Sequence, residues 1–309
     1  MQATLDQYRG CLLGLSLGDA LGAPFEGGIL ERLLWRVIGS TPKGETRWTD
    51  DTQMSIDIIE SFLKMGRIDP DDIAITFAKS YRWSRGYGPK AAKVLKRIAK
   101  GANWREANRS GFASGSFGNG AAMRAPMMGL IYANQPKEHL ENSTSLIASI
   151  THAHPLGIEG ARLLAQATVG VLKGLPSLEV IGEGAEACSL EPFTSRLAIA
   201  RTWLQSGHEA TIHEVRRKLG NGIAAPASCV TALYLALRFR EQSFPTTQHY
   251  IAQLGGDVDT IGAMAGAVWG ASNGFAKLPS DQLERLEQRE KLLDLATSLH
   301  RRVLENQSG

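Results

Sequence analysis

Two short acidic motifs, more than two hundred residues apart, carry the side chains best suited to chemistry in this 309-residue chain. They are Trp48-Thr49-Asp50-Asp51-Thr52 and Gly255-Gly256-Asp257-Val258-Asp259-Thr260. Their carboxylate and hydroxyl oxygens are hard ligands, which suit Mg²⁺ or Mn²⁺ better than zinc. If the fold brings the motifs together, they could hold two such ions.

Each motif could instead be the capped start of a helix. Thr49 or Asp50 could cap a helix that begins at Asp51, and Asp257 or Asp259 could cap a helix that runs through Met264. A single motif of this kind would be weak evidence for a metal site. Two motifs, each followed by an apolar helix, favour the metal interpretation.

The segment from Gly18 to Glu26 leaves an apolar helical stretch and enters a Gly/Pro loop. Glu26 follows Pro24 and Phe25, and apolar neighbours can raise the pKa of a carboxyl so that it serves as an acid or base. Asp19 is compatible with a turn or cap residue.

A glycine-rich loop extends from Ser114 to Arg124. Its glycines would let backbone N–H groups approach a ligand, and a helix N-terminus favours a phosphate. The loop lacks the GK[ST] of a Walker A motif and follows no strand, so a tight helix–loop–helix joint is the alternative.

Farther along, His152 and His154 are two residues apart and would face different sides of a helix, so a shared metal ion is not expected. Either histidine could be purely structural.

Apolar residues recur at helical spacing, and alternating strand patterns are almost absent. The chain is therefore predicted to be all-α, a single domain over residues 1–309 with roughly a dozen helices and its site on loops and helix ends. Ser280-Asp281, after Pro279, is predicted to cap the C-terminal helix. The clearest apolar stripes are Met54, Ile58, Ile59, Phe62 and Leu63; Leu163, Leu164, Ala167, Val171 and Leu172; Val230, Leu233, Tyr234 and Leu237; and Leu283, Leu286, Leu293 and Leu299.

Composition narrows the class of protein. Hydrophobic residues make up 43% and charged residues 21% of the chain, and the formal net charge is only +3, as in an ordinary globular protein. The densest basic stretch, Lys90 to Arg97, reads first as a solvated helix face and second as a nucleic-acid contact, and direct nucleic-acid binding is not expected.

The lack of a recognisable targeting signal and the sparse, unpaired cysteines favour one cellular compartment. The N-terminus has no basic region followed by an apolar one, and no segment reaches the ~18 unbroken apolar residues of a membrane span. Cys11, Cys188 and Cys229 form no CxxC pair and are expected to be buried, reduced side chains. We expect a cytoplasmic protein without a membrane partner.

Five segments together resemble the ADP-ribosylglycohydrolase family, in the same order and at similar separations. The family includes the dinitrogenase-reductase-activating glycohydrolase and the vertebrate ADP-ribosyl-acceptor hydrolases. The resemblance extends from Gly10 to about Arg302. The segments are GDALGAPFE, WTDDTQMS, GSFGNGAAMR, ITHAHPLG and GGDVDTIGAMAGA.

The resemblance implies an all-α fold with two Mg²⁺ or Mn²⁺ ions and an ADP-ribose-containing substrate. It implies metal ligation by Thr49, Asp50, Asp51, Asp257, Asp259 and Thr260, with Asp257 or Asp259 bridging the ions and Asp257 also contributing to catalysis. By the same resemblance, Glu26 is the mobile catalytic glutamate over the metals. The implied substrate contacts are the diphosphate loop Gly115, Ser116, Phe117, Gly118 and Asn119, together with His152 at the distal ribose or its phosphate, Gly88, and Phe112 stacked on adenine.

Three segments look most like the branch that acts on serine-linked ADP-ribose, poly(ADP-ribose) and O-acetyl-ADP-ribose. The expected reaction is hydrolysis of the glycosidic bond at C1″ of the distal ribose, by a protein that we expect to be a monomer. One alternative is an ADP-ribosyl-arginine hydrolase, and another is a non-catalytic ADP-ribose-binding or structural protein. The segments are Arg85-Gly86-Tyr87-Gly88, Leu219 to Ala225, and Ser298-Leu299-His300-Arg301.

Overall fold

The computed structural model describes residues 2–109 and 114–308, and these form helices joined by loops, with isolated backbone bridges and no sheet. The all-α prediction is confirmed. The described residues contain 17 α-helices, more than expected, because several have only one or two turns and show no periodic pattern. In chain order they are α1 (Leu5–Gly22), α2 (Ile29–Ile38), α3 (Asp50–Met65), α4 (Pro70–Ser80), α5 (Pro89–Ala99), α6 (Trp104–Ala107), α7 (Pro126–Ile131), α8 (Lys137–Ser149), α9 (Pro155–Leu172), α10 (Ser177–Glu186), α11 (Phe193–Ser206), α12 (Ile212–Lys218), α13 (Ala225–Arg238), α14 (Phe244–Leu254), α15 (Val258–Asn273), α16 (Ser280–Leu283) and α17 (Arg289–Ser308). Four 3₁₀ helices join them: η1 (Ala23–Phe25), η2 (Trp83–Arg85), η3 (Asn119–Ala121) and η4 (Phe275–Lys277).

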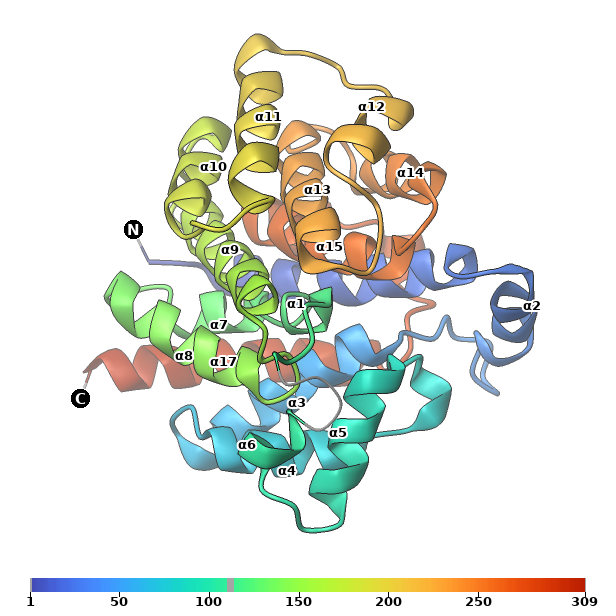
Figure 1. Ribbon diagram of the computed structural model, residues 1–309, viewed down its shortest axis with the longest axis vertical. Helices are drawn as coiled ribbons and strands as arrows, with labels where there is room; N and C mark the ends of the chain where they lie inside the picture. Colours follow the sequence, from blue (N-terminus) through green and yellow to red (C-terminus); the bar gives the residue numbers. More distant parts are fainter. Residues whose placement is uncertain (1, 110–113, 309) are drawn as a thin grey trace.

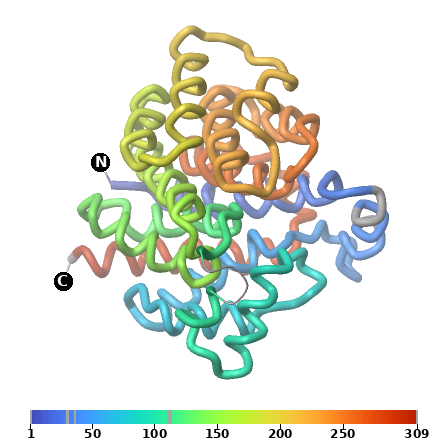
Figure 2. Tube along the Cα trace, viewed as in Figure 1, coloured from blue at the N-terminus to red at the C-terminus, as the bar shows by residue number. Residues whose placement is uncertain are grey.

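Helices α1 and α15 form an antiparallel pair through the middle of the molecule (Figures 1 and 2). Glycines at every fourth position of α1 face glycines at every fourth position of α15. A Cβ atom on Gly18 would lie only 2.1 Å from the Gly262 carbonyl oxygen, so no other residue allows this approach of the two backbones. The facing pairs are Gly10 with Gly270, Gly14 with Gly266, and Gly18 with Gly262.

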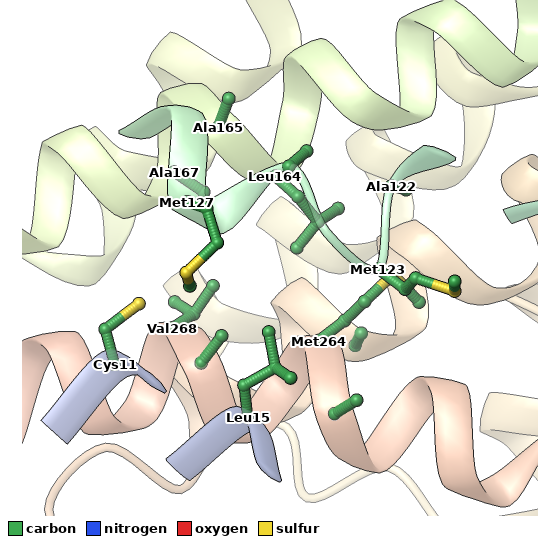
Figure 3. Close-up of a cluster of buried hydrophobic side chains, with 14 of the residues drawn as sticks. Cys11, Leu15, Ala122, Met123, Met127, Leu164, Ala165, Ala167, Met264 and Val268 are labelled. Atoms are coloured by element: carbon green, nitrogen blue, oxygen red, sulfur yellow. The ribbon is translucent and has the colours of Figure 1, made fainter. Parts of the chain in front are cut away.

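The hydrophobic core surrounds this pair. Figure 3 shows Cys11 and Leu15 of α1 beside Met264 and Val268 of α15, with apolar side chains of α7 and α9 packed above them. All three cysteines are buried and unpaired, as expected. In the described part of the chain, no helix has the length and apolar character needed to cross a membrane.

Three of the four predicted helical stripes are confirmed as α3, α9 and α13, but the C-terminal prediction is wrong in two respects. Ser280 does not cap a long helix, because α16 ends after one turn and makes no side-chain cap hydrogen bond. The chain then leaves the helical path at 284–288. Its backbone bonds instead to Thr46, whose N–H donates to the Arg285 carbonyl (2.6 Å) and whose carbonyl accepts from Glu287 N–H (3.0 Å).

Candidate functional site

The first acidic motif lies at the start of α3. Thr49 is the N-cap residue, and its hydroxyl accepts from Asp51 N–H (3.4 Å) and donates to an Asp51 carboxylate oxygen (2.9 Å). The capping interpretation therefore holds for Thr49. It does not account for Asp51, whose other carboxylate oxygen is buried with no hydrogen-bond partner.

The second motif lies at the start of α15. Asp257 occupies the N-cap position, but its side chain makes no cap hydrogen bond, whereas an Asp259 carboxylate oxygen accepts from Thr260 N–H (2.8 Å) in the first turn. Gly256 has φ +77°, and a Cβ there would lie 2.1 Å from the Asn221 carbonyl oxygen. The same carbonyl accepts from Asp257 N–H (2.9 Å), and the turn thereby aims the Asp257 carboxylate away from the helix end toward Asn119 Nδ2, which donates to it.

The fold brings the two motifs together. The Thr260 hydroxyl lies 3.5 Å from a carboxylate oxygen of Asp51, although the two residues are 209 positions apart. The close α1–α15 packing continues to the end of α1, where a Cβ on Gly22 would lie 2.5 Å from the Asp259 Cα. The turn η1 then carries Glu26 to the same place, and oxygens of Glu26, Asp257 and Asp259 lie within 4.8 Å of one another.

Within the described residues, no lysine, arginine or histidine forms an ion pair with Asp50, Asp51, Asp257 or Asp259. The cation that acts on Asp50 from a distance is the buried Arg124. Burial, and then neighbouring carboxylates, raise the pKa of Asp50, Asp51 and Asp259 well above its usual value. An orphaned buried oxygen and several crowded carboxylates fit a divalent cation, which would offset the repulsion. The donors are all oxygens, as Mg²⁺ and Mn²⁺ prefer.

Asp19 supports the first motif from a neighbouring helix, a role that the sequence interpretation missed. It is fully buried in α1 and accepts from the N–H groups of Thr49 (2.9 Å) and Thr52 (3.1 Å) and from the Thr52 hydroxyl (2.6 Å). Burial outweighs these bonds and raises its pKa to about 6. In the sequence, the one indication of this role is that Asp19 directly follows Gly18, one of the glycines that recur every fourth residue in α1.

Replacing Asp19 by alanine should lower the free energy of unfolding by about 1–3 kcal/mol, because it leaves buried N–H groups of α3 without their acceptor. Urea denaturation in EDTA measures this change. Ser16→Ala is the matched control, since the buried Ser16 hydroxyl bonds only within α1, to the Leu12 carbonyl. Equal losses for both variants would show that Asp19 does not support α3.

A cavity of about 520 Å³ opens above the carboxylates. Most of the predicted site residues line it, but Thr49, Asp51 and Gly115 do not, and Phe112 lies outside the described residues. Thr49 and Asp51 are buried next to the cavity residue Thr260. The predicted residues along the wall are Glu26, Asp50, Gly88, Ser116, Phe117, Gly118, Asn119, His152, Asp257, Asp259 and Thr260.

The glycine-rich loop forms one wall of this cavity. The loop was expected to enter a helix. It leads instead into the 3₁₀ turn η3, so no α-helix N-terminus lies at this point. Gly115 has φ +80°, and a Cβ there would lie 2.7 Å from His154 N, so the loop packs closely against the histidine segment. The backbone N–H groups of Ser116 and Phe117 donate to no described residue and remain available to a ligand.

The two histidines have separate roles in a segment that is not helical. His154 is the N-cap of α9 and accepts from Leu156 N–H (3.1 Å), a structural role. His152 is buried along the cavity, with Nδ1 2.8 Å from the Thr151 hydroxyl. Burial, with the Arg124 and Lys90 charges, lowers its pKa to about 3, so its ring is neutral at physiological pH. The buried Arg124 guanidinium bonds to the Gly120 carbonyl and the Thr151 hydroxyl, and thus joins the glycine loop to the histidine segment.

The branch-specific segments differ in their relation to the cavity. Gly86, Tyr87 and Gly88 line it, as do Ile223 and Ala224. The third segment, 298–301, lies within α17, where His300 contacts the Ala3 carbonyl and the Tyr8 ring and does not reach the cavity.

Arg85 lies outside the cavity and contacts two residues that are far apart in the sequence, Trp48 and Glu287. Its guanidinium makes two hydrogen bonds to the Glu287 carboxylate (2.7 and 2.8 Å) and stacks 3.6 Å from the Trp48 ring centre. It also donates to the Trp48 carbonyl (2.7 Å), and Trp48 Nε1 donates to the Glu287 carbonyl (3.1 Å). The C-terminal segment thereby fixes the residue that precedes Thr49.

Comparisons with known proteins agree with this geometry. A family model described as ADP-ribosylglycohydrolase matches residues 1–309. The ADP-ribosylhydrolase ARH3 of Gallus gallus is 34% identical over 342 residues, covering 95% of this chain and 92% of that protein. The Homo sapiens ARH3 is 34% identical over 343 residues, covering 96% and 94%. A solved structure described as an ADP-ribosylglycohydrolase-related protein complex superposes with a TM-score of 0.73 at 28% identity, covering 97% of this chain and 98% of that one. The chain therefore belongs to the ADP-ribosylglycohydrolase family of enzymes.

Proposed function

We propose that this enzyme is a metal-dependent hydrolase of the C1″ glycosidic bond of ADP-ribosylated substrates, with two Mg²⁺ or Mn²⁺ ions. The observation that carries the proposal is the meeting of the two acidic motifs and Glu26 below one cavity. The proposed ligands are Thr49, Asp50, Asp51, Asp257, Asp259 and Thr260. When bound, the ions would orient the distal ribose through its hydroxyls and activate water near C1″.

The protein groups account for the rest of the reaction. A transition state with oxocarbenium character develops positive charge at C1″, which the surrounding carboxylates stabilise. Glu26 transfers a proton to the leaving oxygen or from the attacking water. Asn119 holds the Asp257 carboxylate in place through its side-chain amide, which also donates to Ser228 (2.9 Å).

Substrate binding uses the wall of the cavity. Ser116 and Phe117 line the cavity with N–H groups that have no acceptor among the described residues, and backbone N–H groups of this kind bind phosphate oxygens well. Neutral His152 lies where it can bond to the distal ribose through Nε2, because Nδ1 is engaged by Thr151. We keep Phe112 as the proposed adenine contact.

For the leaving group we propose an O-linked class: serine-linked, polymeric or O-acetyl ADP-ribose. The similarity to the ARH3 proteins supports this choice, as does the position of Gly86 to Gly88 and of Ile223 along the cavity. The runner-up is hydrolysis of ADP-ribosyl-arginine. A non-catalytic binder is disfavoured because a protein that only binds ADP-ribose has no need for a full set of buried, unpaired carboxylates.

The substrate prediction is a higher kcat/KM for ADP-ribosyl-serine peptide and O-acetyl-ADP-ribose than for ADP-ribosyl-arginine. An alcohol and a guanidine leave with different shapes and charges, and a site matched to one leaves polar groups unpaired with the other. Steady-state kinetics on all three, with EDTA and with added Mg²⁺ or Mn²⁺, provide the test. A clear preference for the arginine conjugate would overturn the assignment to the O-linked class and leave the metal proposal standing.

We further propose that the protein is a cytoplasmic monomer. Its three buried, unpaired thiols suit a reducing compartment.

A further inference from the structure

A second groove of about 470 Å³ adjoins the catalytic cavity on the surface of α5. Pro89 lines both the groove and the cavity, and Lys90, the next residue, lines the cavity. The groove therefore begins at the rim of the proposed active site. Along the helix axis it extends about 16 Å from Pro89 to Lys100, at about 1.5 Å per residue. Figure 1 shows α5 at the surface of the molecule.

The groove is strongly basic. Lys93, Lys96, Arg97 and Lys100 recur at helical spacing, so they lie on one face of α5, and all four are exposed. With Pro89 and Ala92 they make up its entire lining, which contains no acidic residue. A protein with a formal net charge of only +3 thus concentrates four cations beside its catalytic cavity.

The charges of these four side chains are not neutralised by carboxylates of the described residues. Within residues 2–109 and 114–308, none of the four forms an ion pair with a carboxylate, and Lys96 only approaches the Tyr81 ring (5.5 Å). Other basic residues of the chain have such partners: Arg302 pairs with Glu305, and Arg162 pairs with Glu141. A free, one-sided cationic groove attracts anions and concentrates them near it.

We propose that the α5 groove, defined by Pro89, Ala92, Lys93, Lys96, Arg97 and Lys100, binds the diphosphate of a further ADP-ribose unit joined to the one in the cavity. This inference rests on the proposed function and deepens it, since it makes poly(ADP-ribose) a preferred substrate class. The polymer repeats a diphosphate in every unit, so a unit outside the cavity presents its charges to the cationic face of α5. The groove is close in volume to the cavity that would hold the first unit.

The test compares Lys93→Glu/Arg97→Glu with a matched control, Arg217→Glu/Lys218→Glu. Both pairs are exposed on helices, and both double variants change the formal net charge by the same amount. The α5 variant should reduce kcat/KM for poly(ADP-ribose) by about tenfold or more at low salt, because it reverses the charge of the groove. Hydrolysis of O-acetyl-ADP-ribose, which has a single diphosphate, should stay within about twofold, and the control variant should match wild type on both substrates. The loss should shrink toward 1 M salt, where the Debye length falls from about 10 Å at 0.1 M to about 3 Å.

Several results would overturn the proposal. These are an unchanged kcat/KM for the polymer, an equal loss on both substrates, or an equal loss in the control variant. Fluorescence anisotropy of labelled polymer in EDTA, with single-stranded RNA of similar charge as competitor, separates the remaining cases. If the α5 variant loses affinity for RNA and keeps its affinity for the polymer, the groove is a nucleic-acid site and the proposal fails. If wild type cleaves no ADP-ribose compound and still binds polymer more tightly than the α5 variant, the proposed function fails and the groove assignment stands.

Discussion

Asp259→Ala and Asp51→Ala are each expected to lower kcat/KM by about 10³-fold or more and to remove bound metal. A metal centre contributes several kcal/mol to transition-state stabilisation, and each 1.36 kcal/mol corresponds to a factor of about ten. The two residues come from different motifs, 208 positions apart, so equal effects would show that the motifs act as one centre. Activity with added Mn²⁺ and metal content by mass spectrometry are the measurements.

Stability provides a second readout of the same variants. Wild-type protein should gain stability when Mg²⁺ or Mn²⁺ is added after EDTA, since a ligand that binds only the folded state stabilises it. The alanine variants should lose this gain. In EDTA, Asp51→Ala should be no less stable than wild type, because it removes a buried carboxylate whose neighbours repel it and one of whose oxygens has no partner.

Asp57→Asn is the matched control for the metal variants. Asp57 is also fully buried in α3, but it accepts from Gln53 Nε2 (2.9 Å) and the Ser80 hydroxyl and does not line the cavity. This variant should keep its metal and its response to metal. Full activity of extensively chelated wild type would contradict the two-ion proposal.

Glu26→Gln is expected to lower kcat by about 10²- to 10⁴-fold, the usual cost of losing a general acid or base. The amide keeps the size of the side chain and can still form hydrogen bonds, so ADP-ribose should bind within a few-fold of the wild-type affinity. Single-turnover kinetics and calorimetry measure the two quantities separately. Glu214→Gln, at a capping box on α12, is the control and should retain wild-type kcat.

The position of Glu26 makes metal affinity the decisive companion measurement. Its carboxylate lies as close to Asp257 and Asp259 as a third ligand of the same ion would lie. If Glu26 transfers a proton, Glu26→Gln lowers kcat and leaves Mn²⁺ affinity near that of wild type. A large loss of Mn²⁺ affinity in Glu26→Gln would instead show that Glu26 is a metal ligand. A wild-type kcat in this variant would show that another carboxylate transfers the proton.

The residue types of the site were readable from the sequence because ligand chemistry resides in single side chains. Oxygen donors crowded at two predicted helix starts indicated a hard cation without knowledge of the fold. The helices α3, α9 and α13 were also predictable, since an apolar stripe at helical spacing must be buried wherever the helix packs. Local physics thus determined the proposed ligands, the main helices and the absence of a sheet among the residues that the structure describes.

Only the tertiary structure decided how these pieces meet. The approach of Asp51 to Thr260 depends on the facing glycines of α1 and α15, and a glycine pattern does not reveal its partner helix. Asp19 looked like a turn residue because its acceptor role requires Thr49 and Thr52, which are about thirty positions away. The prediction of a continuous C-terminal helix failed because the backbone bonds between Thr46 and residues 285–287 outweigh the local helical preference there. Contacts between distant segments set these features, and their free energy depends on distances that a linear sequence does not contain.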